Sequence, residues 1–430
     1  MSNSLDRAVP PIYSDLSSFV LSLKPDLKHH KLDNGTSVYL IEGGTQEVIT
    51  MQMVFNVGTI YYKNVCIPEA TNALLLNGTN RYKHKAITEM FENEGIFVEV
   101  DCGKKHSSIQ VKCLTKSFVK CLPVLCEILT EANFEEEEIE IFKKNAILNL
   151  TKELDKSNFH ANRNIRQTLY GSEHPYGSFS TIQQYNDLNQ VDILECYEQY
   201  YKIGKCTIFV SGFVGQVNLN ELNQTIGKLS LNNYFSTTPR LEKPNYKSEK
   251  KTINISNKVH QSSIRIGRPI VNIFHDDHYK LRILNNLLGG YFDSRLNRTI
   301  REEKGYTYGI DSHIFNAVDL SSLIISAEIN QATVADCIEE VKKEFLRLQN
   351  TLIDIDELKA VQNYLLGKFL NELDGVFNVA LIWQNYLLNE IPIEFFHRSV
   401  NNIKKITPED IKAMAKKYLN YNDFCELIVN

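Results

Sequence analysis

Two side chains near residue 300 have the types and spacing to hold a peptide carbonyl. Arg301 and Tyr308 lie in the run DSRLNRTIREEKGYTYG, which occupies residues 293–309. A guanidinium supplies a fixed positive charge and a phenol supplies a directed O–H, and both can stabilise the oxyanion that forms when a carbonyl carbon is attacked. The chemistry that this pair indicates is therefore recognition of a peptide carbonyl.

The elements around this pair are predicted to be a short helix that runs directly into a strand. Asp293 is a suitable N-cap, and Gly305 is suited to ending the helix. Tyr306, Tyr308 and Ile310 alternate as one face of a strand would. A helix end that carries the arginine and a strand start that carries the tyrosine can direct both side chains at one point.

Both residues also have a purely structural interpretation. Arg301 could bond the free carbonyls at a helix end, and Tyr308 could be an aromatic residue of a sheet core with a satisfied hydroxyl. Composition and spacing alone favour this second interpretation. A further observation is needed before the pair counts as a binding site.

The bulk composition excludes several classes of function. A chain of 430 residues with 43% apolar and 23% charged residues is typical of a globular protein with two to four domains. A net charge of −5 and the lack of a basic run predict no binding to nucleic acid or to a membrane surface. No apolar run approaches the ~18 to 20 residues of a membrane span, and the N-terminal residues do not have the pattern of a secretory signal.

The cysteines indicate a reducing compartment. There are nine, an odd number, and their spacing does not suit a metal. Cys121 and Cys126 lie on a predicted amphipathic helix, whereas Cys102, Cys113 and Cys206 lie in predicted strands. We expect buried, reduced thiols and a cytoplasmic location.

The order of elements predicts two α+β halves. Residues 1–27 are predicted to be an arm, and residues 28–228 a first half with strands and helices in separate runs. Residues 229–249, rich in Asn, Ser, Thr, Pro and Lys, are typical of a linker. Residues 250–430 form the second half. Such runs favour mostly antiparallel sheets with helices packed on one side.

The two halves are predicted to be copies of one unit. Both long helices end on the same tripeptide, Glu153-Leu154-Asp155 and Glu372-Leu373-Asp374, and the element order around each is the same. Three matched residues are weak evidence by themselves, because all three types are common in helices. The shared order of elements makes an internal duplication the better explanation.

The run around Arg301 resembles the C-terminal half of the pitrilysin and mitochondrial-processing-peptidase family of zinc peptidases. The similarity begins at Leu287-Leu-Gly289-Gly290 and continues through Tyr308, and the overall resemblance covers about residues 28–430. It implies a clamshell of two homologous halves. It also implies that Arg301 and Tyr308 correspond to the family's substrate-binding arginine and tyrosine, which match in type and spacing.

The zinc motif of this family is missing. The resemblance places an H-x-x-E-H motif on the helix whose sequence here is CIPEATNALLLNGT, so that the first His falls on Glu69, the Glu on Asn72 and the second His on Ala73. The third ligand would fall near Asn149. Neither H-x-x-E-H nor H-E-x-x-H occurs anywhere in the chain. We therefore expect no metal and no catalytic residue in this chain, because two imidazoles and a general base are what the chemistry requires.

Another group of residues could be mistaken for a metal site. His275-Asp276-Asp277-His278 precedes a predicted helix, where the acids suit the positive helix end and one of them would serve as the N-cap. We interpret this run as a cap.

The resemblance implies a non-catalytic, substrate-binding subunit of a heteromeric zinc endopeptidase. In this hypothesis a homologous partner that carries H-x-x-E-H supplies the zinc, and the substrate is a peptide or an unfolded polypeptide. The alternative is a structural subunit of a larger assembly without proteolytic function. A third possibility, an active peptidase of one chain type, requires a zinc site that the sequence lacks.

Overall fold

The computed structural model describes most of the chain beyond the predicted arm. The described residues are 26–217, 219–234, 241–242, 244–255, 261–317 and 320–430. The arm predicted for residues 1–27 thus lies outside the described residues, except for the first two residues of strand β1. Part of the predicted linker, residues 235–240 and 243, lies outside them too.

The first half contains a six-stranded sheet in the order β1-β2-β6-β3-β5-β4. Neighbouring strands are antiparallel except β2 and β6, which are parallel. In the central strand β3, Ile49, Met51 and Met53 alternate into the core, as the two-residue period of a strand requires. The strands are β1 (Asp26–Lys31), β2 (Ser37–Glu42), β3 (Val48–Phe55), β4 (Phe97–Cys102), β5 (Ser107–Leu114) and β6 (Cys206–Gly212).

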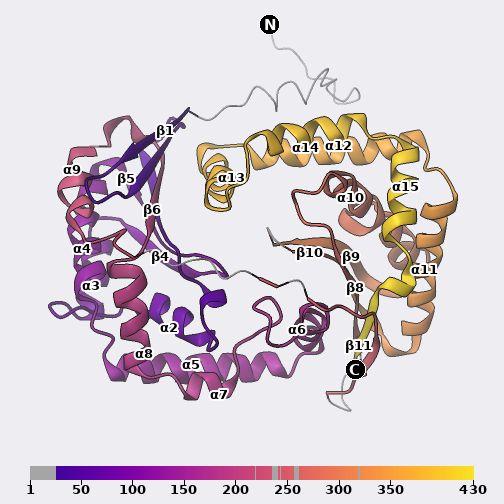
Figure 1. The fold of residues 1–430 in the computed structure, drawn as a ribbon, viewed down its shortest axis with the longest axis horizontal. Helices are drawn as coiled ribbons and strands as arrows, with labels where there is room; N and C mark the ends of the chain where they lie inside the picture. Colours follow the sequence, from indigo (N-terminus) through magenta and orange to yellow (C-terminus); the bar gives the residue numbers. More distant parts are fainter. Residues whose placement is uncertain (1–25, 218, 235–240, 243, 256–260, 318–319) are drawn as a thin grey trace, which may run out of the picture.

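Helices cover this sheet and form one wall of the molecule (Figure 1). The long helix α5 begins on three consecutive glutamates, which the positive end of the helix dipole favours. The helices of the first half, of which α6 does not pack on this sheet, are α2 (Cys66–Leu74), α3 (His84–Glu92), α4 (Phe118–Glu131), α5 (Glu136–Leu154), α6 (Ser157–Tyr170), α7 (Ile182–Asn186), α8 (Gln190–Cys196) and α9 (Leu219–Gln224).

The second half contains a five-stranded sheet in the order β7-β11-β8-β10-β9. Only β7 and β11 pair in parallel. The strands are β7 (Lys250–Ile253), β8 (Gln261–Ile270), β9 (Thr307–Asn316), β10 (Ser321–Asn330) and β11 (Cys425–Val429). The helices are α10 (Asp277–Asn285), α11 (Val334–Asn350), α12 (Ile355–Glu372), α13 (Val376–Leu388), α14 (Glu394–Lys405) and α15 (Pro408–Tyr418).

Each half contributes one helix to the sheet of the other half. Helix α6, which follows the first Glu-Leu-Asp tripeptide, packs on β8 and β11 of the second sheet. Helix α13, which follows the second tripeptide, packs against β6 and β2 of the first sheet. Figure 1 shows α6 beside β8 and β11, and α13 facing β6. The duplicated positions thus hold equivalent helices that cross between the halves.

The fold class predicted from the sequence is confirmed, because two mainly antiparallel sheets with packed helices face each other as two halves. The division into residues 28–228 and 250–430 stays a prediction. None of the described helices is both long enough and apolar enough to cross a bilayer. All nine cysteines are free, and burial raises the pKa of the Cys66 thiol to about 12.

Candidate functional site

Helix α2 and helix α5 bring three of the four zinc-motif positions together. Glu69 and Ala73 lie one turn apart on α2, and with Asn149 of α5 they line one cavity of about 650 Å³. Asn72 points elsewhere, because it is buried and its amide nitrogen donates to the carbonyl oxygen of Ser108 at 3.4 Å. Glu69, Ala73 and Asn149 therefore face one cavity, whereas Asn72 does not.

Glu69 is the only one of these four residues with a carboxylate. Burial raises its pKa, and the hydroxyl of Tyr185 donates a hydrogen bond to its Oε2 at 3.3 Å. The positive charges of Lys104 and Arg163 act in the opposite direction and favour the ionised form. Glu69 is thus already surrounded by a hydroxyl donor and by cations rather than by metal ligands.

The residues at these positions do not fit zinc. Ala73 offers no ligand atom, Asn72 is turned toward the sheet, and two cations lie near Glu69. Zinc in proteins is held by imidazoles, thiolates and carboxylates, of which a catalytic site needs three. Throughout the described part of the chain, no group of three or more His, Cys, Asp or Glu residues could hold a metal ion.

We expect the purified chain to contain far less than one zinc per molecule after incubation with zinc and dialysis. Its melting temperature should not change between zinc and EDTA, since only a ligand that binds the native state stabilises it. Elemental analysis and thermal unfolding measure the two quantities. One tightly bound zinc per chain would contradict this prediction.

Arg301 is held in place by its neighbours. It lies in a π-helical segment, Asn297–Glu303, which precedes β9. Its Nη2 donates to Oε1 of Glu302 at 2.6 Å, and its guanidinium stacks on Phe292 with 3.9 Å to the ring centroid. The Phe292 side chain is largely exposed. The guanidinium is thus fixed against an exposed ring by a cation–π contact and a hydrogen bond.

Tyr308 is exposed, and the predicted alternation with Ile310 is wrong. Its side chain is 94% exposed, whereas Ile310 is buried. Along β10, Ala327 pairs with Ile310 but Ile329 pairs with Thr307, so one residue of β10 faces two residues of β9. This bulge breaks the period of two and turns the phenol away from the buried face.

The prediction for Asp293 is also wrong, since its carboxylate accepts two hydrogen bonds from Arg298, at 2.6 and 2.8 Å, instead of capping a helix. Gly305 adopts a positive φ of 66° after the helical segment, which fits the expected helix end. Among the described residues, no hydrogen bond joins Arg301 to Tyr308. The two side chains come from adjoining elements, and each is free of the sheet core.

The side chains of the run His275 to His278 do not converge on one point. The ring of His275 accepts from the backbone N–H of Asp277 at 3.1 Å, and the Asp277 carboxylate accepts from Lys417 and Tyr418 at 2.6 and 2.7 Å. Asp276 occupies the N-cap position of α10 without a side-chain cap bond. These residues therefore lie at the start of a helix, as interpreted from the sequence. The side chain that accepts a backbone hydrogen bond there is that of His275 rather than that of an acid.

The lowered pKa of His278 predicts that the stability of the fold depends on pH. Burial lowers its pKa from 6.5 to about 4, and the positive charge of Arg282 acts in the same direction. Since the unfolded chain binds the proton more readily, this contribution to stability is complete above about pH 6.5 and is lost as the pH falls toward 4. The loss is on the order of 3 kcal/mol.

Urea unfolding at a series of pH values tests this expectation. His278→Gln, which keeps a donor for Asn316, should unfold with a shallower dependence on pH between about 6.5 and 4 than the unchanged chain. Equal slopes for the two proteins would show that His278 is not the responsible group.

Comparison with known proteins agrees with this fold. A family model described as "Insulinase (Peptidase family M16)" matches residues 45–176, and one described as "Peptidase M16 inactive domain" matches residues 187–365. A structure described as a protease from Helicobacter pylori superposes with a TM-score of 0.84 at 18% identity, covering 95% of this chain and 100% of the other.

Three curated relatives cover most of the chain. The "Uncharacterized zinc protease YmxG" of Bacillus subtilis is 20% identical, covering 91% of this chain and 95% of that protein. The "Non-peptidase homolog YmxG" of Helicobacter pylori is 21% identical, covering 83% and 82%. "Mitochondrial-processing peptidase subunit beta" of Bos taurus is 20% identical, covering 82% and 73%.

The chain belongs to the M16 peptidase family and is a homologue of its inactive type.

Proposed function

We propose that this chain is the non-catalytic, substrate-binding subunit of a heteromeric zinc endopeptidase. The observation that carries the proposal is a contrast within one fold. The positions assigned to the zinc motif carry Glu69, Asn72, Ala73 and Asn149, whereas Arg301 is fixed on an exposed ring and Tyr308 presents an exposed phenol. A partner of the same family that carries H-x-x-E-H supplies the zinc, and this chain supplies Arg301 and Tyr308 to a composite site.

An exposed sheet edge supports peptide binding. Strand β4 is the last strand of the first sheet, and α2 packs beside it. An extended peptide that adds to β4 would form main-chain hydrogen bonds with its free edge, as peptides do on other sheet edges. Phe97, at the start of this strand, is 72% exposed and offers an apolar contact. A peptide bound there would pass the cavity of Glu69 and Ala73.

The relatives are consistent with a complex. One of them is named as a subunit of the mitochondrial-processing peptidase. A structure described as complex III2 from Candida albicans superposes with a TM-score of 0.72. For this chain, the existence of a zinc-bearing partner is proposed.

Reconstitution with a homologous chain that carries H-x-x-E-H tests the proposal. We expect the two chains to elute together from a sizing column, and the pair to cleave an unstructured peptide that neither chain cleaves alone. Replacing the Glu of the partner's motif by Gln should abolish cleavage without affecting assembly. Assembly without any cleavage would favour the alternative, a structural subunit.

A further inference from the structure

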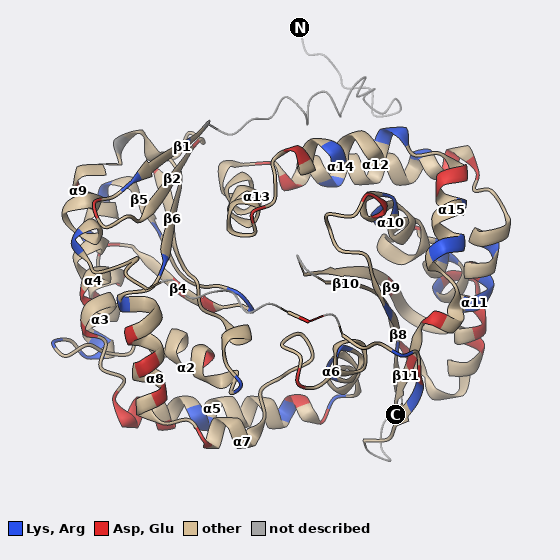
Figure 2. Ribbon diagram, viewed as in Figure 1, with Lys and Arg blue, Asp and Glu red and all other residues tan. Residues whose placement is uncertain are grey.

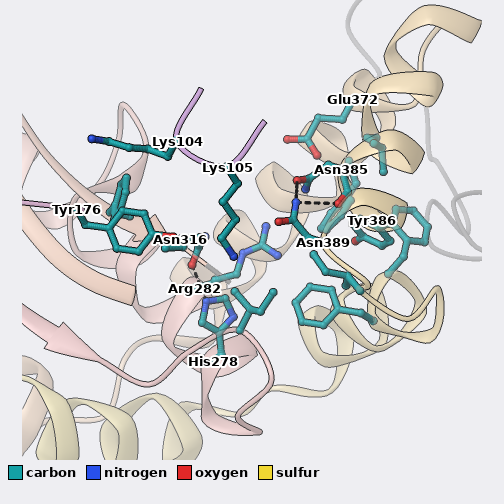
Figure 3. Close-up of a pocket in the computed structure, with 18 residues that line it drawn as sticks. Lys104, Lys105, Tyr176, His278, Arg282, Asn316, Glu372, Asn385, Tyr386 and Asn389 are labelled. Carbon is teal, nitrogen blue, oxygen red and sulfur yellow. Dashed lines mark hydrogen bonds between the residues drawn. The ribbon is translucent and has the colours of Figure 1, made fainter. Parts of the chain in front are cut away.

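A second cavity lies between the two halves and is not used by the proposed composite site. Its volume is about 460 Å³, within the range of sites that bind small ligands or a few residues of a peptide. Figure 3 shows that its lining comes from both halves. The first half contributes the turn between β4 and β5, and the second half contributes α10, α12 and α13.

Both halves contribute cationic side chains to the lining of this cavity. Lys105 of the β4–β5 turn and Arg282 of α10 line it and point into it in Figure 3. Arg282 forms no ion pair within the described residues, and Glu372 is the one carboxylate among the residues that line the cavity. In Figure 2 the backbone beyond the β4 label is blue, the colour of Lys and Arg, at its end facing the second half. The chain as a whole has a net charge of −5, so this local excess of cations is unusual for it.

The turn that carries the lysines is held rigidly. The backbone N–H groups of Thr59 and Ile60 donate to the carbonyl oxygens of Gly103 and Lys104 at 3.1 and 3.0 Å. Gly58 packs so closely that a Cβ atom there would lie 2.3 Å from the carbonyl oxygen of Lys104. The backbone of the turn is therefore positioned before any ligand binds, which reduces the cost of binding.

The adjoining wall adds further positive charge. Lys104 points away from the cavity in Figure 3, and its Nζ donates to the carbonyl oxygens of Pro175 and Ser178 at 3.1 and 3.3 Å. Behind the wall, the guanidinium of Arg166 stacks over Phe315 at 4.9 Å from the ring centroid. The positive charges of Lys104 and Arg166 add to those of Lys105 and Arg282 near the cavity.

The remaining lining combines aromatic rings with groups that accept hydrogen bonds. His278 donates from Nε2 to Asn316 Oδ1 at 2.8 Å, so its Nδ1 is an acceptor, and that buried atom has no hydrogen-bond partner among the described residues. The aromatic residues of the lining are Tyr176, Phe315, Phe369, Tyr386, Phe395 and Phe396.

We infer that this cavity binds a carboxylate of an extended peptide, with the neighbouring apolar residues of that peptide against the aromatic wall. The substrate class is therefore acidic peptides, and the inference rests on the proposed peptide-binding function. The carboxylate belongs to a Glu or Asp side chain or to the C-terminus, and both present the same chemistry to Lys105 and Arg282. Because one cation comes from each half, the bound carboxylate also connects the halves.

Peptide binding to the full chain tests this inference. Three unstructured fluorescent peptides of equal length share the same apolar residues and carry Glu, Gln or Lys at their polar positions, each with a free or an amidated C-terminus. We expect the Glu peptide to bind roughly tenfold more tightly than the Gln peptide, a difference of ~1.4 kcal/mol, and the preference to weaken with salt. Loss of binding on amidation alone would identify the C-terminus as the carboxylate.

Variants of the cavity complete the test. Arg282→Gln should reduce the preference for Glu severalfold, whereas Arg282→Lys should retain most of it. Gly58→Ala keeps every charge but displaces the turn, and it should also reduce the preference. The matched control is Lys85→Gln, because the Lys85 side chain is 89% exposed on α3. Circular dichroism and melting temperature establish that each variant is folded.

The outcomes separate this inference from the proposed function. Equal affinity for the Glu and Gln peptides together with no loss of binding on amidation, or an unchanged preference in Arg282→Gln, overturns the acidic-peptide inference and leaves the proposed subunit function standing. Binding of the Glu peptide without cleavage by the reconstituted pair supports the inference and contradicts the proposed function. If none of the peptides binds, both are overturned.

Discussion

Arg301→Ala is expected to lower kcat/KM for peptide cleavage by the reconstituted pair by ~100- to 1000-fold. The reason is that a donor aimed at a developing oxyanion contributes ~2.7 to 4 kcal/mol to the stability of the transition state. Arg301 is suited to this role because Phe292 and Glu302 already fix its guanidinium, at 3.9 and 2.6 Å. Little reorganisation is then needed when the substrate binds. Tyr308→Phe removes only a hydroxyl and should cause a smaller loss in the same quantity.

The measurement is a fluorescence assay of kcat and KM on the purified pair, with a sizing column to follow assembly. Arg298→Ala is a matched control on the same segment, because Arg298 pairs with Asp293 through two hydrogen bonds. We expect the control to keep its kcat/KM. If Arg301→Ala cleaves as fast as the unchanged pair, the structural-subunit alternative gains support.

Leu169→Ala is expected to destabilise the whole chain by ~2 to 5 kcal/mol, the usual cost of removing a fully buried leucine. Leu169 lies on α6 and is completely buried, in a cluster that includes Ile324 and Leu427 of the second sheet. A cavity at this contact weakens the packing between a helix of the first half and the sheet of the second. The effect should therefore extend to both halves.

Urea unfolding with two probes measures this effect. Circular dichroism follows the whole chain, and fluorescence follows Trp383, the only tryptophan, which packs with Ile41 where α13 meets the first sheet. We expect both midpoints to shift together in Leu169→Ala. Leu148→Ala on α5 is the control, since Leu148 is 51% exposed and should cost little. A shift of only one probe would mean that the exchanged helices do not couple the halves.

Local sequence patterns were sufficient to predict two α+β halves with strands and helices in separate runs. The alternating apolar residues of β3 and the acidic start of α5 each depend on neighbours within a few positions, and such patterns record which face of an element is apolar. The same patterns failed at Tyr308. Its exposure depends on how β9 pairs with β10, and the bulge in that pairing is decided by contacts about twenty residues away.

The features of the candidate site were likewise only partly predictable from the sequence. Residue identities alone exclude an H-x-x-E-H motif, because a missing imidazole cannot be restored by any fold. The cavity between the halves was not predicted, since it needs Lys105, Arg282 and Tyr386 to meet from three distant parts of the chain. A lone lysine after a strand, or a lone arginine on a helix, carries no signal that it will face the other.

The sequence by itself determined the class of fold, its duplication and the absence of an H-x-x-E-H motif, because each of these is a property of residue types and of their local order. Only the tertiary structure decided that α6 packs on the second sheet and α13 on the first, that Tyr308 is exposed, and that cations of both halves line one cavity. Those features arise from contacts between surfaces far apart in the chain. An apolar helix face shows that a residue will be buried, but it does not show which sheet will cover it.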